Sequence, residues 1–291
     1  MTKHTTRLRR LIDDPKILVV PGAYDGLGAR LVQALGFQAI YLSGFQTSAS
    51  VLGQPDVGYL TLTQMAARVS ALAEVADLPL IADGDTGYGN PLNVRRAVRE
   101  YEKAGAAAMH IEDQTFPKRC GHMTGRHVVP GEEMVQKIKA AVDARQDADF
   151  VIIARTDART TRGLAEALER GAAYHEAGAD MLFIESPETE EEMRRSCAAF
   201  QGVVPVLCNQ IEGGRTPMPG VRVLEEMGYA LALFSLGTAF AAARGIRDYL
   251  EVLASEGDTR GALQDMVMFD EFNKLIGLDE HAELERRYQT P

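Results

Sequence analysis

The run LPLIADGD at residues 78–85 is apolar up to its last three positions, where two aspartates flank a glycine. A strand that is apolar at nearly every position is buried on both faces, as the strands of parallel sheets are. Comparable short runs recur along the chain, and each is followed by an amphipathic helical pattern. The others are ILVVPGA (17–23), QAIYLSG (38–44), AAAMHIED (106–113), DFVIIARTD (149–157), ADMLFIES (179–186), VVPVLCNQ (203–210) and ALALFSLG (230–237).

Eight strand–helix units predict a closed (β/α)8 barrel, the TIM barrel, which we expect to fill residues 1–291 as a single domain. The competing fold is a doubly wound open sheet, but its GxGxxG fingerprint does not open the first helical segment. Beyond the eighth strand, residues 238–291 carry further helical patterns. This C-terminal helical extension must pack on its own barrel or on a neighbouring subunit.

The composition limits the classes of partner. Acidic residues outnumber basic ones by 41 to 31, so the formal net charge is -10, and we expect neither nucleic acid nor an anionic membrane as a partner. The N-terminus lacks the apolar run of a signal peptide, and no stretch approaches the length of a membrane span. The three cysteines suggest no disulfide framework. These features predict a cytoplasmic protein.

Carboxylates end two neighbouring strands, where the catalytic groups of a barrel gather. Asp83 and Asp85 are two residues apart on one strand and therefore point the same way, and Glu112 ends the next strand. Adjacent carboxylates repel unless a cation or a proton lies with them. Oxygen ligands suit Mg²⁺, with Mn²⁺ as a substitute. The alternative is that such carboxylates cap the following helices, which we prefer for Asp113.

Other strand ends are polar as well. Arg155 is suited to bidentate capture of a carboxylate or phosphate, or to a structural salt bridge with Glu185 or Asp157. Ser43 and the amides after it predict either an anion cradle or an ordinary turn. Asp56 is either a turn residue or an active-site carboxylate. Further polar side chains at strand ends are Glu185, Asn209 and Ser235.

The stretch FPKRCGHMTGRHVV (116–129) places a cysteine among cations, in a loop long enough to act as a lid. Lys118, Arg119 and His122 are expected to lower the pKa of Cys120 by favouring its thiolate. A thiol with a pKa near the working pH can give or take a proton. The alternative is an inert, exposed cysteine.

Taken together, these motifs resemble the isocitrate lyase/phosphoenolpyruvate mutase superfamily, over nearly the whole chain. KRCGH is the signature of its lyase branch. Within that branch, CGHMTGRHVVP and IEGGRTP are more similar to 2,3-dimethylmalate lyase and petal death protein than to methylisocitrate lyase. The motifs are YLSG (41–44), DGDTGYGN (83–90), HIEDQ (110–114), KRCGH (118–122), IIARTDA (152–158) and NQIEGGRTP (209–217).

The resemblance implies a barrel whose last helix is exchanged with a partner subunit, giving a homotetramer as a dimer of helix-swapped dimers. It implies Mg²⁺ held by Asp85, with Asp83 and Glu112 in contact through water, and a gating loop at 116–130. It also implies a substrate site around the carboxylate and C2 oxygen of a small-molecule carboxylate. That site would comprise Ser43, Gly44, Phe45, Asp83, Gly121, Arg155, Asn209, Ile211 and Ser235.

The expected activity is that of a Mg²⁺-dependent carbon–carbon lyase. It would cleave a substituted 2-hydroxy dicarboxylate, of the 2,3-dimethylmalate or 2-methylisocitrate type, into a 2-oxoacid such as pyruvate and a carboxylate. Asp56, Tyr41 or Glu185 would remove the hydroxyl proton, and Cys120 would protonate the released carbanion. The groups expected to stabilise its charge are Lys118, Arg119, His122 and Asn209.

Three other functions compete with this one. Ser235 is typical of relatives that hydrolyse oxaloacetate to oxalate and acetate, although petal death protein shares it. Phosphoenolpyruvate mutase-like C–P chemistry would leave Cys120 without a purpose. A non-catalytic binding protein fits poorly with so many ionisable groups at a barrel mouth.

Overall fold

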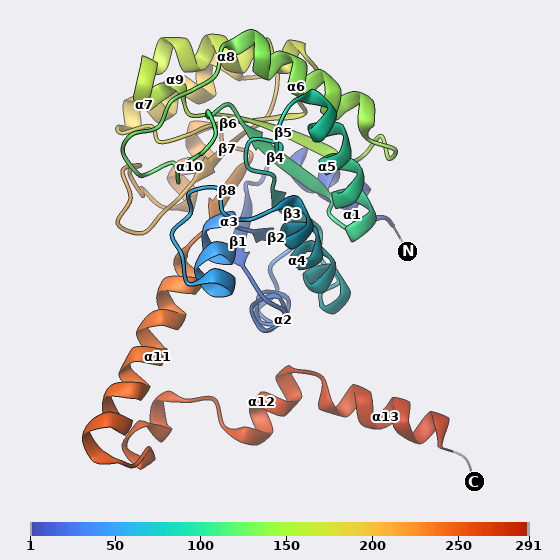
Figure 1. The fold of residues 1–291 in the computed structure, drawn as a ribbon, viewed down its shortest axis with the longest axis vertical. Coiled ribbons are helices and arrows are strands. Elements are labelled where there is room, and N and C mark those ends of the chain that lie inside the picture. The colour runs from blue at the N-terminus through green and yellow to red at the C-terminus, as the bar shows by residue number, and fades with distance from the viewer. Residues whose placement is uncertain (1, 290–291) are drawn as a thin grey trace.

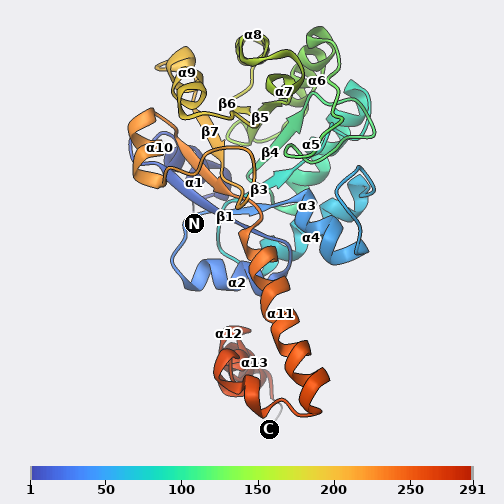
Figure 2. The same cartoon turned by 90° about the vertical axis from the view of Figure 1, so that its left-hand side faces the viewer.

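The strands form a closed ring in the computed structural model, which describes residues 2–289 (Figure 2). Each strand pairs in parallel with its neighbours in chain order, and the first also pairs with the eighth. This ring confirms the predicted (β/α)8 barrel. The strands are β1 (Leu18–Ala23), β2 (Ile40–Leu42), β3 (Leu80–Asp83), β4 (Ala108–Glu112), β5 (Val151–Thr156), β6 (Met181–Ile184), β7 (Val206–Asn209) and β8 (Leu231–Phe234).

Helices surround the ring and cover the outer faces of the strands (Figure 2). Short helical turns, α3 (Gly44–Thr47), η1 (Ser48–Leu52) and α7 (Ala158–Arg162), follow β2 and β5 at the barrel mouth. The longer helices are α2 (Gly26–Ala34), α4 (Leu62–Val75), α5 (Pro91–Ala104), α6 (Gly131–Ala144), α8 (Leu164–Glu176), α9 (Glu190–Phe200), α10 (Val221–Met227) and α11 (Gly237–Glu256).

Local sequence signals set where these helices begin and end. Thr61 and Gln64 form a reciprocal capping box at the start of α4. Asn90 accepts hydrogen bonds from the first amides of α5, whose first residue is Pro91. The same helix ends at Gly105, which adopts the left-handed conformation (φ 100°) that a side chain would disfavour.

Side chains of each strand alternate between two apolar layers. On β3, Leu80 and Ala82 pack outward against the helices, whereas Ile81 packs inside the barrel. Residues two apart on a strand share a face, so Asp83 continues the inward row of Ile81. The alternation therefore directs the last residue of β3 into the mouth of the barrel.

Helix α1 (His4–Ile12) closes the opposite end of the barrel. Leu8 and Ile12 belong to the cluster that fills the barrel interior, and Leu8 is fully buried. Arg9 fastens the helix by donating to the Ala148 carbonyl (3.0 Å) and to Asp180 Oδ1 (2.9 Å). The barrel is therefore sealed below and open for chemistry only at the carboxyl ends of its strands.

The C-terminal extension begins on the barrel and then leaves it. Thr238 of α11 donates to the Gly22 carbonyl oxygen (2.8 Å), but the helix then runs away from the barrel (Figure 1). None of the residues of α11 is buried, although Phe240, Ile246 and Leu250 are large and apolar. Among the described residues, no helix combines the length and apolar character needed to cross a bilayer. Beyond α11 lie η2 (Arg260–Asp265), α12 (Phe269–Leu275) and α13 (Leu278–Tyr288).

Leu8→Ala is expected to lower the free energy of unfolding by about 2–5 kcal/mol, because it leaves a cavity under the barrel core. Urea unfolding monitored by circular dichroism measures this change. Arg10→Ala, on the exposed side of the same helix, is the matched control and should change stability by less than about 0.5 kcal/mol. Equal losses in the two variants would contradict the sealing role of α1.

Candidate active site

Two carboxylates converge at the end of β3. A Cβ added to Gly84, the residue between them, would lie 2.6 Å from the His110 carbonyl oxygen, so a side chain there would separate β3 from β4. Asp85 adopts a left-handed backbone conformation (φ 48°), which is costly for a residue with a side chain. A Cβ on Gly44 would lie 2.9 Å from Asp83 Oδ2 and 3.5 Å from Asp85 Oδ1. Both carboxylates therefore face one point at the mouth.

Asp83 is fixed by its neighbours. The amides of Gly44 and Asp85 each donate to it at 3.0 Å, and the Tyr41 hydroxyl donates at 3.4 Å. His110 Nε2 lies 3.3 Å from Asp83 Oδ1 and 2.7 Å from the Tyr41 hydroxyl. Burial lowers the pKa of His110 to about 4, so the ring is neutral and belongs to the barrel core. The Gly44 amide is thus engaged by Asp83 in this arrangement.

Arg155 at the end of β5 joins three carboxylates. Its Nε donates to Asp157 Oδ2 (2.9 Å) and lies 3.3 Å from Glu112 Oε2, and its Nη1 lies 3.3 Å from Glu185 Oε2. Burial acts to lower the pKa of Arg155, but these carboxylates raise it well above its ordinary value. The structural ion pairs expected at this position are therefore present, and the side chain also lines a cavity.

Lys118 carries a second buried positive charge to the mouth. Its Nζ lies 2.7 Å from Asp56 Oδ2 and 2.7 Å from Asp85 Oδ1. Burial would lower the pKa of this ammonium, but Asp85 and Asp56 raise it well above its ordinary value. Asp56 therefore lies at the mouth, beside Lys118 and Asp85.

The loop at 116–130 lies closed over these groups. A Cβ on Gly121 would come within 2.6 Å of both Arg155 Nη2 and Glu185 Cδ, so the loop backbone itself touches the mouth. The space beneath it is a cavity of about 20 Å³. That is room for about one water molecule. Its walls are formed by Ser43, Phe45, Asp56, Asp83, Lys118, Cys120, Gly121, Arg155, Ile211, Ser235 and Leu236.

Cys120 lies in this wall, but its pKa moves opposite to the expectation from its cationic neighbours. Burial raises the pKa of the Cys120 thiol to about 11, and Asp56 and Glu185 add to the rise. Loop closure removes water from the sulfur and brings carboxylates close to it, which the local sequence does not reveal. The thiol is therefore protonated at neutral pH, the form required of a proton donor.

Arg119 and His122 also differ from the expectation. Arg119 is exposed, and its Nη1 donates to the Thr124 carbonyl (3.4 Å) within the loop, so its charge does not reach the cavity. His122 Nδ1 accepts from the Arg215 amide (2.8 Å), which places the ring proton on Nε2, 3.1 Å from Glu185 Oε1. Of the two permanently charged cations in this motif, Lys118 and Arg119, only Lys118 lines the cavity.

The three candidate bases have different environments. Burial and Asp83 raise the pKa of Tyr41 well above its ordinary value, so Tyr41 stays protonated and is unsuited to accept a proton. Burial acts to raise the pKa of Glu185, but Arg155 and His122 lower it overall. The resulting carboxylate lies behind the cavity wall. Asp56 is the candidate base that lines the cavity.

Residues after β7 and β8 complete the wall. The Ser235 hydroxyl donates to Asn209 Oδ1 (2.8 Å), which turns the amide nitrogen toward Glu185 Oε2 (3.5 Å). Ile211 adds an apolar surface. Leu236 lines the same cavity, and its sequence position did not predict this role, because a leucine after a strand end is normally a core residue.

Arg126 anchors the loop at 116–130, a role that was not predicted from the sequence. It is buried, pairs with Asp157, and donates to Thr160 Oγ1 (2.7 Å). Asp157 also pairs with Arg155, so one carboxylate joins the loop to the wall of the cavity. Its position inside the CGHMTGRHVVP motif is the only sequence signal, because a loop arginine normally suggests solvent exposure.

Asp113 does not cap the helix that follows its own strand, contrary to our preference. It is fully buried and accepts from Thr156 Oγ1 (2.7 Å), the Asp157 amide (2.9 Å) and Tyr174 (2.8 Å). Arg170 balances its charge at 3.1 Å. The residue therefore links β4 to β5 and α8.

The mouth holds more negative than positive side chains. The buried acids in contact there are Asp56, Asp83, Asp85, Glu112, Asp157 and Glu185, and the buried cations are Lys118, Arg126 and Arg155. Six carboxylates against three cations leave a surplus of three negative charges. Burying unpaired carboxylates is costly, so the surplus favours an additional cation or bound protons.

The oxygen donors of the mouth fit a hard divalent cation. Asp85 Oδ1 and Glu112 Oε1 are buried and accept no hydrogen bond, although Lys118 lies near the former. Within residues 2–289, no three His, Cys, Asp or Glu side chains are grouped closely enough to hold a metal by themselves. Mg²⁺ usually keeps several waters and takes one or two carboxylates from the protein. The donor set therefore fits an ion bound partly through water.

Comparison with known proteins decides the family. Residues 8–253 match the phosphoenolpyruvate phosphomutase family. The chain belongs to this family. It is 51% identical over 284 residues to 2,3-dimethylmalate lyase of Eubacterium barkeri, covering 98% of each chain. It is 42% identical to petal death protein of Dianthus caryophyllus, covering 99% of this chain and 91% of that one. The likeness expected from the motifs is confirmed.

Solved structures of the family agree with the fold. Oxaloacetate acetylhydrolase in complex with the inhibitor 3,3-difluorooxalacetate superposes with a TM-score of 0.94 at 36% identity, covering 98% of this chain and 97% of that one. Phosphonopyruvate hydrolase in complex with oxalate and Mg²⁺ superposes with a TM-score of 0.90 at 32% identity, covering 99% of both. Members of one fold family therefore act on small oxyacids by different reactions.

Alkylation of Cys120 by iodoacetamide is expected to accelerate about tenfold per pH unit from pH 7 to pH 10, without levelling off. The reason is that the thiolate is the nucleophile, and a thiol with a pKa of about 11 is still mostly protonated at pH 10. Peptide mapping by mass spectrometry follows the site separately from buried Cys197 and Cys208. A rate that reaches its plateau below pH 8 would mean that the thiol is acidic.

Proposed function

We propose that the chain is a divalent-cation-dependent carbon–carbon lyase that cleaves an alkyl-substituted 2-hydroxy dicarboxylate, of the 2,3-dimethylmalate type, into a 2-oxoacid and a carboxylate. One observation carries the proposal: a protonated thiol, Cys120, shares a closed cavity with Asp56 and with Asp83 of the carboxylate cluster. Cleavage of such a substrate needs a group that binds the C1 carboxylate and C2 oxygen, and a proton donor near C3. The cavity has candidates for both.

Asp85 is the direct ligand in this proposal, and Asp83 and Glu112 act through water. Asp85 Oδ1 and Glu112 Oε1, which are buried and accept no hydrogen bond, and the charge surplus of the mouth support this assignment. A bound Mg²⁺ would polarise the carboxylate and the C2 oxygen of the substrate and lower the pKa of the C2 hydroxyl. Mn²⁺ has the same preference for oxygen and would substitute.

Asp56 is the proposed base. It lines the cavity, and Lys118 at 2.7 Å holds it in place. It takes the C2 hydroxyl proton, the C2–C3 bond breaks, and C2 becomes the carbonyl carbon of the 2-oxoacid. The bonding electrons pass to C3 and the adjoining carboxylate. For 2,3-dimethylmalate the products are pyruvate and propionate.

Cys120 then gives its proton to C3, which completes the carboxylate product. The positive charges of Lys118 and Arg155 stabilise the negative charge that develops on that fragment. Asn209 donates to Glu185 Oε2, and His122 Nε2 lies 3.1 Å from Glu185 Oε1, so both residues hold the wall. Because the closed loop leaves about 20 Å³, little water competes with the thiol as a proton source. The proton gained by Asp56 must return to the sulfur through solvent before the next turnover.

The cavity wall supports a substrate with alkyl substituents. Phe45, Ile211 and Leu236 present apolar surface. The cations lining the cavity are Lys118 and Arg155, and each is already paired with carboxylates. The third carboxylate of 2-methylisocitrate would need a further cation, so we rank it below dimethylmalate.

Oxaloacetate hydrolysis is the second candidate, and Ser235 is the observation that favours it. Its hydroxyl lies in the cavity wall, where it can contact a hydrated carbonyl. C–P chemistry of the mutase type has no use for the Cys120 thiol. Release of pyruvate from 2,3-dimethylmalate supports the lyase, whereas release of oxalate from oxaloacetate with no action on dimethylmalate would replace it by the hydrolase.

We also propose that residues 238–291 join subunits, by exchange of α11 into a helix-swapped dimer and pairing of such dimers into a tetramer. The exposed apolar residues of α11, including Ile246 and Leu250, support this assembly. We further propose that residues 1–291 act as one catalytic domain in the cytoplasm. Its partner would be a small carboxylate and not nucleic acid or membrane.

Cys120→Ser is expected to lower the turnover number for 2,3-dimethylmalate roughly 10²- to 10⁴-fold, because a hydroxyl is a far weaker acid than a thiol. The Kd for Mg²⁺ should stay the same. Steady-state pyruvate release and calorimetry measure the two quantities. Thr124→Ala changes an exposed residue of the same loop and serves as the control. Turnover by Cys120→Ser equal to that of the control would rule out the thiol as the proton donor.

Asp85→Asn is expected to weaken Mg²⁺ binding at least about tenfold, because the amide keeps the shape but loses the charge of the ligand. Isothermal titration calorimetry of the metal-free protein gives the Kd. Asp143→Asn, an exposed carboxylate on α6, is the control for nonspecific attraction. Full activity after removal of divalent cations, with no metal left by elemental analysis, would disprove the cation requirement.

A further inference from the structure

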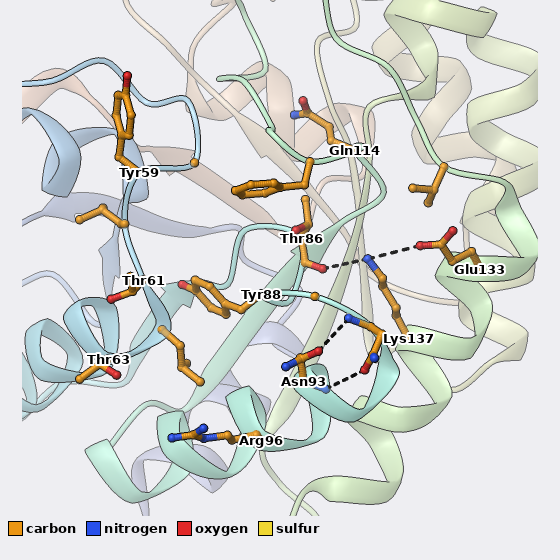
Figure 3. A pocket seen from close by; sticks show the side chains of 17 residues that line it. Tyr59, Thr61, Thr63, Thr86, Tyr88, Asn93, Arg96, Gln114, Glu133 and Lys137 are labelled. Carbon is orange, nitrogen blue, oxygen red and sulfur yellow. Dashed lines mark hydrogen bonds and ion pairs between the residues drawn. The ribbon is translucent and has the colours of Figure 1, made fainter.

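A second cavity, of about 670 Å³, lies beside the mouth (Figure 3). It is enclosed by the segment before α4, the loop after β3, the first turns of α5 and α6, and the residues after β4. It shares no lining residue with the catalytic cavity. Its volume is in the range of small-molecule ligand sites, and the mechanism above does not use it.

The charged side chains of this cavity are mainly positive. Arg96 and Lys137 line it, against a single acid, Glu133. Lys137 is buried, donates to the Thr86 carbonyl (3.1 Å), and lies 3.7 Å from Glu133 Oε1 (Figure 3). Arg96 is exposed to solvent, and within residues 2–289 its side chain forms no ion pair or hydrogen bond. In a chain of net charge -10, such a cavity attracts anions.

Two helices begin at this cavity and strengthen the positive field. The first residues of α4, Leu62 and Thr63, and the start of α5 at Asn90 and Asn93 all line it. Each helix is 14 residues long, and the N-terminus of a helix carries partial positive charge. Asn90 already accepts from the first amides of α5, so that helix contributes its field and no free donors.

The rest of the wall is apolar. Leu60 and Leu62 line it, and so does Phe116, a residue that is 73% exposed and lies against Gly58. Tyr88 presents its ring, because its hydroxyl is engaged by Tyr101 at 2.7 Å. An inorganic anion would leave this surface in contact with water. An anion that carries an aromatic or aliphatic body would cover it.

We propose that this cavity is a separate ligand site for an organic anion with an apolar body. Arg96 and Lys137 meet the charged group, and the rings of Tyr88 and Phe116 meet the body. The ligand contacts Thr86, the residue after Asp85, and Phe116, at the start of the gating loop, so it is placed to influence both. The site goes beyond the proposed lyase activity, and binding can be measured without turnover.

Phenyl phosphate and phenylacetate are the probes, because they combine an anion with a ring and distinguish phosphate from carboxylate recognition. Each is titrated into the full-length protein by calorimetry, with Mg²⁺ and saturating oxalate present to occupy the catalytic cavity. At least one probe is expected to bind, at least about tenfold more tightly than inorganic phosphate or acetate. Binding of neither probe, or equal binding of the simple anions, overturns the proposal.

Arg96→Gln locates the probe. Removal of one charged contact is expected to raise the Kd of the probe about ten- to hundredfold. Arg99→Gln removes an equal charge from an exposed position on the same helix outside the cavity and should leave the Kd unchanged. Circular dichroism verifies that both variants fold. An unchanged Kd in Arg96→Gln, or displacement of the probe by oxalate, overturns the site, whereas failed lyase assays would leave it standing.

Discussion

The charge balance of the barrel mouth is the constraint on which the rest of the structure depends. Six buried carboxylates meet three buried cations in a space that nearly excludes water. An unpaired buried charge costs several kcal/mol, so this arrangement depends on its ion pairs. Two of the three cations, Lys118 and Arg126, arrive on the loop at 116–130. Closure of the loop therefore lowers the negative surplus of the mouth, although three negative charges remain unmatched.

The fold followed from the sequence because each signal was local and repeated. Eight apolar strand runs, each followed by an amphipathic helical pattern, repeat the same alternation along the chain. The positions of Asp83, Asp85 and Glu112 followed as well, since strand ends meet at one edge of a parallel barrel. These inferences needed only periodicity and topology.

The loop could not be predicted in the same way, because its contacts are distant in the chain. Cys120 has cations beside it in sequence, but the fold buries it and places Asp56 and Glu185 near it, so its pKa is raised and not lowered. Lys118 and Arg119 are adjacent, yet one is buried and the other exposed. Asp113 was misjudged for the same reason. Its partners come from β5 and α8, and no local pattern reports them.

Between turnovers, the pairing of Lys118 with both Asp56 and Asp85 favours the closed state of the loop. If the loop at 116–130 opens, the Lys118 ammonium leaves the mouth, and Asp56 and Asp85 lose the positive charge between them. The open, empty site thus carries the larger surplus of negative charge, which favours the closed loop, and an entering dicarboxylate would need an accompanying cation to offset its own charge. The loop at 116–130 would then open readily only for a ligand whose charge leaves the net charge of the cluster balanced.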